Sequence, residues 1–345
     1  MLDTGSAPGV PRSASRLAGV PVAVVGGGPV GRWTALLLAQ AGAVVTLYDD
    51  GSLNTGLING GWGFAYHSHD PAVGHLATQG IELYLRMRDV VLPQGVVTEE
   101  WSTVQRASGA APFPEGLEEL EGYRRLDPAD LSVNMVEGVV VHSVVVPGEL
   151  LLGALAQLHK DLGVTFVREH VADPADISDV AFVVNATGLA SAWLYDDREF
   201  TPSMGTVVRL RKPEGFSGVY AWDDATNCAP YAISQDATGH VVVGGTTKPV
   251  TIEQAREWVD AGSPPDMATG EFLLGHISSY LPALAKAEYV RTDTGIRPER
   301  SDIRIARDQN DARVIHATGF GGFGVTVAPA VAARVVDLVA AGVQR

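Results

Sequence analysis

The residues of this chain with the clearest chemical meaning form a glycine-rich stretch near the N-terminus. Gly26-Gly-Gly28-Pro-Val-Gly31 has the spacing G-x-G-x-x-G, and Asp49 follows about 20 residues later. In such a stretch the first glycine allows a tight turn, the second lets a pyrophosphate approach the backbone, and the third lets a helix pack closely on a strand. The pattern predicts a dinucleotide site in which Asp49 accepts hydrogen bonds from ribose hydroxyls.

The segments around the glycines are those that such a site needs. Residues 22–25 are a short apolar run typical of a buried strand, residues 32–40 have helical character, and residues 43–48 read as a second strand that ends at Asp49. A helix that begins directly after the glycines presents free N–H groups and a partial positive charge to phosphates. FAD and NAD are both compatible with this unit, whereas the lack of an arginine near Asp49 in the sequence argues against NADP.

Composition limits the class of protein. The chain has 345 residues, 46% hydrophobic and 19% charged, as expected for a globular protein with two domains. A net charge of −15 disfavours nucleic acid or an anionic membrane as a partner, and no apolar run is expected to cross a bilayer. Residues 1–19, rich in Ser, Ala, Gly and Pro, are expected to be a disordered leader. The single cysteine, Cys228, excludes a disulfide within the chain and fits a cytoplasmic protein.

Two consecutive segments after Asp49 could contact ligands. Residues 51–66 are rich in glycine and contain Trp62, Phe64 and Tyr66, which predicts a backbone that comes close to a flat or bulky group. The segment His67-Ser-His-Asp70 has metal-binding residue types, but it offers no further ligand nearby. An ordinary polar segment is the better interpretation, and no metal site is predicted.

Segments with the character of a cofactor-binding unit occur at the start, in the middle and at the end of the chain. The middle one is an apolar strand that ends in Thr187-Gly188, and the last is a strand at residues 314–316 that enters a glycine-rich turn and a helix. Because the material between them is strand-rich and lacks βαβ order, the sequence predicts an α/β fold (α+β overall) with a discontinuous Rossmann-like domain and an inserted mixed-sheet domain. The expected boundaries are residues 20–60, 139–195 and 290–345 for the dinucleotide-binding domain, and residues 61–138 and 196–289 for the inserted substrate domain.

Motifs spread over roughly residues 20–340 resemble the FAD-dependent D-amino acid oxidase family, which includes D-aspartate oxidases and, more distantly, glycine oxidases. Besides the glycine fingerprint they are Tyr123-Arg-Arg-Leu126, Val183-Val-Asn-Ala-Thr-Gly188, Pro230-Tyr231, Val243-Gly-Gly245, Gly295-Ile-Arg-Pro298 and Val314-Ile-His-Ala-Thr-Gly-Phe-Gly-Gly-Phe-Gly-Val-Thr326. The last two are the most specific. The resemblance implies that the discontinuous domain binds FAD.

The resemblance also implies roles for individual residues. Arg297 would bind the carboxylate of the substrate, since a guanidinium offers two parallel donors and stays charged. Tyr231 would donate a second hydrogen bond to that carboxylate, and Tyr220, Trp222 and Phe320 would complete the substrate pocket. FAD would be held without a covalent bond, because Cys228 does not stand where related enzymes attach flavin. The residues expected to contact FAD are Gly26, Gly28, Pro29, Val30, Gly31, Asp49, Asp50, Asn59, Gly60, Gly61, Val171, Thr187, Gly188, Arg297, Gly321, Gly322, Phe323, Gly324, Val325 and Thr326.

The reaction that the resemblance implies is oxidation of the α C–N bond of a D-amino acid. Hydride would pass to flavin N5, dioxygen would be reduced to hydrogen peroxide, and the imino acid would hydrolyse to a keto acid and ammonia. Two departures from the family pattern affect the side-chain pocket. Met204-Gly205 stands where Arg-Gly is common, and Thr226 and Asn227 stand where a second tyrosine is usual. Glycine or a bulky N-substituted glycine is therefore an alternative substrate.

Two other classes of protein stay open at this point. A flavin-dependent hydroxylase needs a nicotinamide cofactor and usually a Gly-Asp pair in the last flavin loop, and residues 319–326 contain no Asp. A non-catalytic dinucleotide-binding protein would show no reduction of its flavin by an amine. The expected partners are a small amine that carries a carboxylate and dioxygen, and a homodimer is an open alternative for the assembly.

Overall fold

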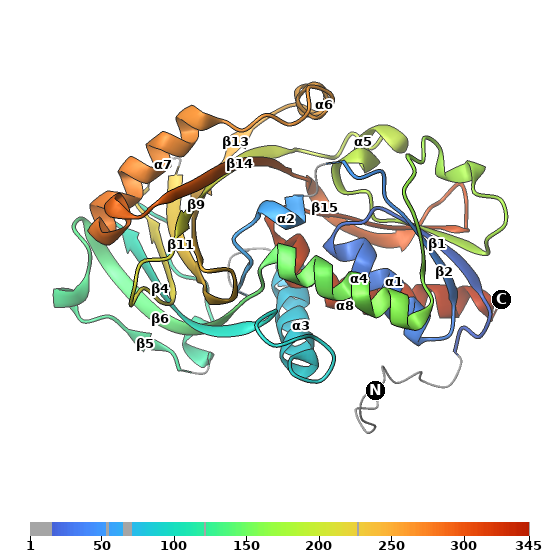
Figure 1. The fold of residues 1–345 in the computed structure, drawn as a ribbon, viewed down its shortest axis with the longest axis horizontal. Helices are drawn as coiled ribbons and strands as arrows, with labels where there is room; N and C mark the ends of the chain where they lie inside the picture. The colour runs from blue at the N-terminus through green and yellow to red at the C-terminus, as the bar shows by residue number, and fades with distance from the viewer. Residues whose placement is uncertain (1–15, 53–54, 65–70, 121, 226–227, 345) are drawn as a thin grey trace.

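The computed structural model describes residues 16–52, 55–64, 71–120, 122–225 and 228–344. It consists of two halves, each built on one sheet (Figure 1). The helices are α1 (Pro29–Gln40), α2 (Thr55–Ile58), α3 (Pro71–Met87), α4 (Gly148–Leu162), α5 (Ser191–Leu194), α6 (Ile252–Asp260), α7 (Met267–Tyr280) and α8 (Gly324–Val343). Short 3-10 turns lie at Leu117–Glu119, Pro128–Asp130, Pro174–Asp176, Gly188–Ala190, Asp236–Thr238, Pro282–Lys286 and Gly321–Phe323.

The first half is a six-stranded sheet with helices packed against it. Its strands follow the order β15 (Glu299–Arg307), β16 (Val314–Phe320), β8 (Phe182–Asn185), β1 (Pro21–Val25), β2 (Val44–Tyr48) and β7 (Thr165–Val167). All neighbours pair in parallel except β15 and β16. Strand β1 is central and apolar, and its last residue, Val25, lies beside Tyr48 and Asn185. The carboxyl ends of these strands therefore meet at one edge, where ligands of open α/β sheets bind.

The second half is a ten-stranded sheet, and it is strongly curved in Figure 1. Its main path runs through β13 (Lys248–Pro249), β9 (Ser203–Arg211), β12 (His240–Thr246), β11 (Cys228–Gln235), β10 (Val219–Asp223), β4 (Thr98–Ala107), β6 (Met135–Val145) and β3 (Trp62–Gly63). Strand β14 (Tyr289–Arg297) pairs with β9, and β5 (Arg124–Arg125) pairs with β6. Helix α7 packs on the outer face of this sheet (Figure 1).

The boundaries expected at residues 139 and 290 cut through this second sheet. Strand β6 pairs along its length with β4, and β14 pairs with β9 from Tyr289 to Arg297, so both belong to the substrate half. After β9 the chain next returns to the first half between Arg297 and Glu299, where β14 passes into β15 (Figure 1). In the sequence, β6 and β14 are each followed by segments of the first half. Their sheet is decided by their pairing partners, β4 and β9, which are distant along the chain.

Helix α8 is the central helix of the first half. By length and composition Gly321–Val343 could cross a membrane, yet 67% of its apolar window is buried inside the protein. Its start is fixed by Tyr84 of α3, which donates a hydrogen bond to the Val325 carbonyl at 2.8 Å and accepts one from Trp33 of α1 at 3.2 Å. The expectation that no apolar run is long enough to span a bilayer is thus wrong, because a core helix whose residues 325–332 are all buried is apolar on every side over that stretch.

The structured chain begins earlier than the predicted boundary at residue 20. Leu17 is completely buried, and its N–H donates to the Ala41 carbonyl at 3.0 Å. Arg16 pairs with Asp337 near the end of α8 at 2.9 Å. The predicted leader is therefore too long at its C-terminal end, and residues 1–15 lie outside the described chain.

Candidate active site

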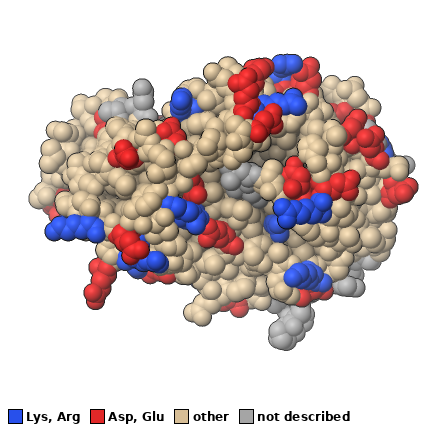
Figure 2. All heavy atoms as spheres, turned by 45° about the horizontal axis from the view of Figure 1, so that its top comes forward, with Lys and Arg blue, Asp and Glu red and all other residues tan. Residues whose placement is uncertain are grey.

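A deep cleft of about 790 Å³ lies between the two halves and extends along the carboxyl edge of the six-stranded sheet. One end is formed by the turn after β1, and the other by the inner face of the ten-stranded sheet, with Arg297 and Tyr231. Helix α2 lies between the halves (Figure 1). Its residues Thr55, Gly56 and Ile58, and the following residues 59–61, line the cleft. On the face shown in Figure 2, acidic and basic side chains of the described residues are interspersed and form no large patch of one sign.

The glycine-rich turn forms the first end of the cleft. Gly26 has a φ of 113°, and a side chain there would collide with the backbone of Ala186, so only glycine fits. Helix α1 starts after Gly28 with Pro29 at its first position and with no side-chain cap. Its free N–H groups therefore point at the cleft, as phosphate binding requires. Gly26, Gly28, Pro29 and Val30 line the cleft as predicted.

Gly31 has a structural part in this turn. It is not among the residues that line the cleft, and a side chain on it would run into the carbonyl of Gly26. Its contact with the cofactor stays a prediction, whereas the close approach of α1 to β1 that the fingerprint implies is present. The absence of a Cβ lets the first turn of α1 lie directly on the preceding loop.

Asp49 and Asp50 line the cleft at the ends of the sheet strands, as predicted. The structure adds an arginine that the sequence did not suggest. Arg32, in the first turn of α1, donates from Nε to the Gly27 carbonyl at 2.8 Å, and its Nη2 lies 3.7 Å from Asp49. The expectation that no arginine lies near Asp49, which was used to argue against NADP, is thus wrong. The Arg32 cation is engaged by Asp49, and burial lowers its pKa from the ordinary value.

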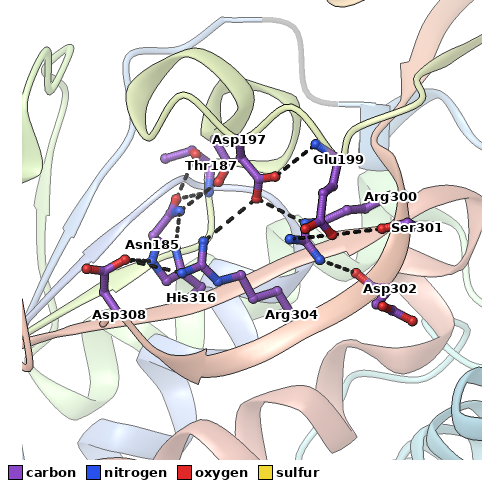
Figure 3. Close-up of polar contacts among 11 residues, drawn as sticks. Asn185, Thr187, Asp197, Glu199, Arg300, Ser301, Asp302, Arg304, Asp308 and His316 are labelled. Carbon is purple, nitrogen blue, oxygen red and sulfur yellow. Dashed lines mark hydrogen bonds and ion pairs between the residues drawn. The ribbon is translucent and has the colours of Figure 1, made fainter. Parts of the chain in front are cut away.

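The middle of the cleft is bounded by Thr187 and Gly188, and a buried polar network holds this turn from behind (Figure 3). Asn185 accepts hydrogen bonds at Oδ1 from the Thr187 hydroxyl at 2.7 Å and from its N–H at 3.3 Å. The Asn185 amide lies 2.9 Å from Nδ1 of the fully buried His316, whose Nε2 lies 2.9 Å from Asp308. The amide N–H can only donate, so Nδ1 accepts and Nε2–H donates, which fixes a neutral His316 tautomer.

Charged side chains extend this network to the start of β15 (Figure 3). Asp197 has a 5% exposed side chain and accepts from Arg300 at 3.0 Å, and Arg304 lies 3.7 Å from the same carboxylate. Arg300 also pairs with Glu199 at 2.9 Å. These pairs attach the start of β15 to the segment after α5, so the crossing that carries Arg297 is held on both sides.

Arg297 ends strand β14 at the opposite end of the cleft. Its guanidinium lies over Gly205 of β9, donates from Nη2 to the Thr246 carbonyl at 3.1 Å, and lies 3.5 Å from the Ser203 hydroxyl. Among the residues that the structure describes, no carboxylate pairs with it. The charge is therefore satisfied only by neutral oxygens and stays available to an anion.

Tyr231 lies on β11 and lines the same end of the cleft. Its hydroxyl lies over Gly244 of β12, where a side chain would displace it. Burial raises the pKa of Tyr231, and the nearby Arg297 charge opposes that change without cancelling it. The hydroxyl is thus protonated at neutral pH and can donate a hydrogen bond. The structure brings Arg297 and Tyr231 to one end of the cleft, as predicted.

Tyr220, predicted to complete the substrate pocket, does not line the cleft. Adjacent residues of a strand point to opposite faces, and on β10 Ala221 and Asp223 line the cleft. The Tyr220 ring lies in the hydrophobic cluster behind the sheet, 5.7 Å from the Phe216 ring. Trp222 borders the cleft, but its ring stacks on Tyr280 of α7 at 4.7 Å, and its indole donates to Ser132 at 3.0 Å.

The remaining predicted residues lie along the cleft. Its lining includes Asn59, Gly60, Gly61, Val171, Phe320, Gly321, Gly322, Phe323, Gly324, Val325 and Thr326. The sequence did not indicate Arg106, Phe113, Trp193, Asp223 or Trp258, which also line it. Periodicity in the sequence can show which residues share one face of a strand or helix. It does not show whether that face lines a cleft, because this depends on which element packs opposite. The His67–Asp70 segment lies outside the described residues, and within the described ones no group of three His, Cys, Asp or Glu side chains could hold a metal.

Two buried oxygen atoms indicate that the cleft is built for a polar ligand. Asn59 Oδ1 and Thr318 Oγ1 have no hydrogen-bond partner among the described residues, and both residues line the cleft. The Asn59 amide is fixed by the Gly56 carbonyl at 2.8 Å, so Oδ1 is left as an acceptor. Unsatisfied buried acceptors are rare in native proteins. Together with the bare start of α1 and the carboxylate of Asp49, they fit the phosphates, hydroxyls and N–H groups of FAD.

A glycine fingerprint at one end of the cleft, and at the other an arginine that pairs with no carboxylate of the described residues, fit a dinucleotide-dependent oxidoreductase. Residues 21–338 match the family model described as DAO, FAD dependent oxidoreductase. The chain belongs to this family of FAD-dependent oxidoreductases, and its cofactor is FAD.

Several known proteins similar to this chain in sequence are D-amino-acid or D-aspartate oxidases. It is 28% identical over 332 residues to a D-amino-acid oxidase of Streptomyces coelicolor, an alignment that covers 89% of this chain and 92% of the relative. Human D-aspartate oxidase is 29% identical over 150 residues, 42% of this chain and 40% of that protein. Among solved structures, glycine oxidase from Geobacillus kaustophilus aligns with a TM-score of 0.76 at 19% identity, covering 92% of this chain and 94% of that one.

Proposed function

We propose that this protein oxidises a small amine next to a carboxylate, with a D-amino acid as the substrate. The observation that carries the proposal is Arg297, whose guanidinium lies in the wall of the cleft and has only neutral oxygens as partners among the described residues. A carboxylate fits it because two parallel N–H donors match two oxygens. The chain's net charge of −15 disfavours anions in general, so an anionic substrate needs such a local cation.

The side chains around Arg297 would bind and orient the substrate. Arg297 and the Tyr231 hydroxyl would hold the carboxylate together, which fixes the direction of the α-carbon that carries the amine. Bound FAD supplies the two-electron oxidation of that carbon and, in an oxidase, passes the electrons to dioxygen to give hydrogen peroxide. The described cleft lining contains one histidine, His170, which pairs with Asp50 at 3.0 Å at the fingerprint end. We infer that the amine can lose its proton to solvent, since orientation of the substrate by Arg297 and Tyr231 does not itself require a general base.

A D-amino acid is favoured by the relatives, since the Streptomyces coelicolor and Dictyostelium discoideum proteins that match most of the chain are both D-amino-acid oxidases. Glycine or an N-substituted glycine is the second candidate. Glycine oxidase of Bacillus subtilis is 31% identical over 104 residues, and the small Ala221 beside Tyr231 leaves room next to the expected carboxylate site. Both candidates share the carboxylate, so Arg297 has the same part in each.

The test is anaerobic mixing of the purified flavoprotein with a panel of amines, followed by the visible absorbance of the flavin. The panel contains D-alanine, D-aspartate, D-lysine, glycine, sarcosine and iminodiacetate, because Arg106 and Asp223 in the wall could select acidic or basic side chains. L-alanine and D-alanine methyl ester serve as controls for stereochemistry and for the carboxylate. We expect bleaching by D-amino acids and none by the ester. Bleaching by glycine and sarcosine alone would favour the second candidate, and no bleaching by any compound would refute the proposal. A peroxide assay in air then tests dioxygen as acceptor.

A further inference from the structure

A fully buried cation lies beneath the segment that separates the two halves. Arg209 of β9 is 2% exposed, and burial lowers its pKa from the ordinary value. Its Nε donates to Asp293 of β14 at 3.2 Å, and its Nη2 donates to the carbonyl of Leu57 in α2 at 3.1 Å. A buried ion pair of this kind contributes little net stability, since removal from water offsets most of the attraction. Because Nη2 points at the backbone of α2, Arg209 can hold that segment in place as well as pair with Asp293.

Gln235 of β11 forms the second half of the same arrangement. It is 1% exposed, and its Oε1 accepts from Arg209 Nη1 at 3.3 Å. Its Nε2 donates to the Gly60 carbonyl at 2.8 Å. The contact with Arg209 fixes which end of the amide is oxygen, so the nitrogen must face Gly60. Two buried side chains thus hold both ends of the segment at residues 57–60 by its carbonyl groups.

Fixing these carbonyls fixes the peptide groups that face the cleft. A trans peptide is planar, so the N–H of Gly61 points away from the Gly60 carbonyl and hence away from Gln235. Gly61 itself has a φ of 75°, and its carbonyl accepts from the Val146 N–H at 2.8 Å. Residues 58–61 all line the cleft, whereas Arg209 and Gln235 lie behind them and do not. The clamp, meaning Arg209 with Gln235, therefore sets the orientation of a cleft wall from the other side.

We propose that Arg209 and Gln235 are positioning residues that tune the bound flavin through the backbone of residues 58–61. The proposal rests on the proposed function, because it places the redox-active ring at the Arg297 end of the cleft. Backbone N–H groups that are fixed in advance stabilise charge that develops on reduction, since no reorganisation is needed at that moment. A loosened wall would stabilise the reduced ring less and hold FAD less tightly.

The test compares Gln235→Met and Arg209→Lys with the control Arg211→Met. Methionine has nearly the shape of glutamine but cannot donate a hydrogen bond to the Gly60 carbonyl. Arg211 is an exposed arginine on β9, the strand that carries Arg209. The readouts are the flavin absorption spectrum, the dissociation constant of FAD, and the midpoint potential measured by chemical reduction. None of these requires a substrate, so a failure of the proposed amine oxidation is recognised separately by the amine panel.

We expect Gln235→Met to raise the dissociation constant of FAD about tenfold, the effect of losing about one buried hydrogen bond. The midpoint potential should fall, by about 30 mV for each tenfold loss in affinity for reduced relative to oxidised flavin. Arg209→Lys should give a smaller change of the same sign, because an ammonium can replace part of the contacts. A lower melting temperature with unaltered spectrum, potential and FAD affinity in both variants would show a structural role alone and overturn the proposal. Equal shifts in Arg211→Met would also overturn it.

Discussion

The guanidinium of Arg297 donates to the Thr246 carbonyl and lies near the Ser203 hydroxyl, both of them neutral. Most other arginines of the described chain pair with carboxylates, as Arg300 does with Asp197. An arginine held only by neutral oxygens keeps its shape and direction while its charge is left uncompensated. Arg307 is likewise held by carbonyls, those of Ala312 and Leu338, but it does not line the cleft. At the scale of the single residue, neutral partners together with a place in the cleft lining therefore mark Arg297 as a binding cation.

Replacing Arg297 with Lys or Met tests this distinction. We expect KM for the carboxylated amine found in the panel to rise about a hundredfold in Arg297→Met, as for the loss of a charge-assisted pair of about 3 kcal/mol. Arg297→Lys should fall between, since an ammonium offers no parallel pair of donors. Steady-state kinetics at saturating FAD measure both values. Arg198→Met, at an exposed position outside the cleft, is the control. An unchanged KM in Arg297→Met would remove the residue from the substrate site.

At the scale of the element, the contact between β1 and α1 depends on glycines with different duties. Gly26 supplies a backbone conformation that side chains rarely adopt, and Gly31 supplies space between the helix and the turn. The helix N-terminus faces the cleft because both conditions hold together. The position of the phosphate site is thus a property of packing as much as of the loop itself.

We predict that Gly31→Ala destabilises the protein by roughly 1–3 kcal/mol, the usual cost of overpacking, and weakens FAD binding as the turn shifts. The matched control is Gly153→Ala in α4, where a side chain would meet no atom within 4 Å. Alanine has the higher helix propensity, so the control should stabilise by up to about 1 kcal/mol. Thermal unfolding and retention of flavin on gel filtration measure the two effects. Equal stability of both variants would contradict the packing argument.

For the whole molecule, the interior contains histidines that must stay neutral. His159 of α4 is 5% exposed and donates from Nε2 to the Arg32 carbonyl at 2.8 Å. Desolvation lowers its pKa to about 4 from an ordinary value of 6.5. Burial also lowers the pKa of His316. Below pH 6.5 the unfolded chain therefore takes up protons that the folded chain does not, so stability falls as the pH falls toward about 4.

The pH dependence of unfolding tests the contribution of His159. We expect the free energy of unfolding to decrease between pH 6.5 and about 4, with about 3 kcal/mol of that decrease from His159. His159→Gln keeps a donor for Arg32 and removes the titrating group, so its decrease should be smaller. His75→Gln, an exposed position on α3, is the control. Denaturant unfolding at a series of pH values gives the slopes, and identical slopes for all three proteins would contradict the assignment.

The sequence by itself determined the parts of this protein that depend on neighbours along the chain. The turn after β1, the start of α1 and Asp49 lie within one βαβ unit, so residue spacing alone predicted the fingerprint end of the cleft. Arg297 and Tyr231 were predicted because the short motifs that contain them resemble those of the D-amino acid oxidase family. The tertiary structure confirms that both line one end of the same cleft.

Only the tertiary structure decided what depends on partners far apart in sequence. Strands β6 and β14 joined the ten-stranded sheet, and Tyr220 turned to its outer face, because the edge that a strand pairs with is set by the whole sheet. Likewise Arg32 meets Asp49, and Arg209 and Gln235 meet residues 57–60, through contacts that have no local sequence signal. Motifs of neighbouring residues can be recognised from the sequence, whereas the direction of a side chain depends on which elements pack against each other.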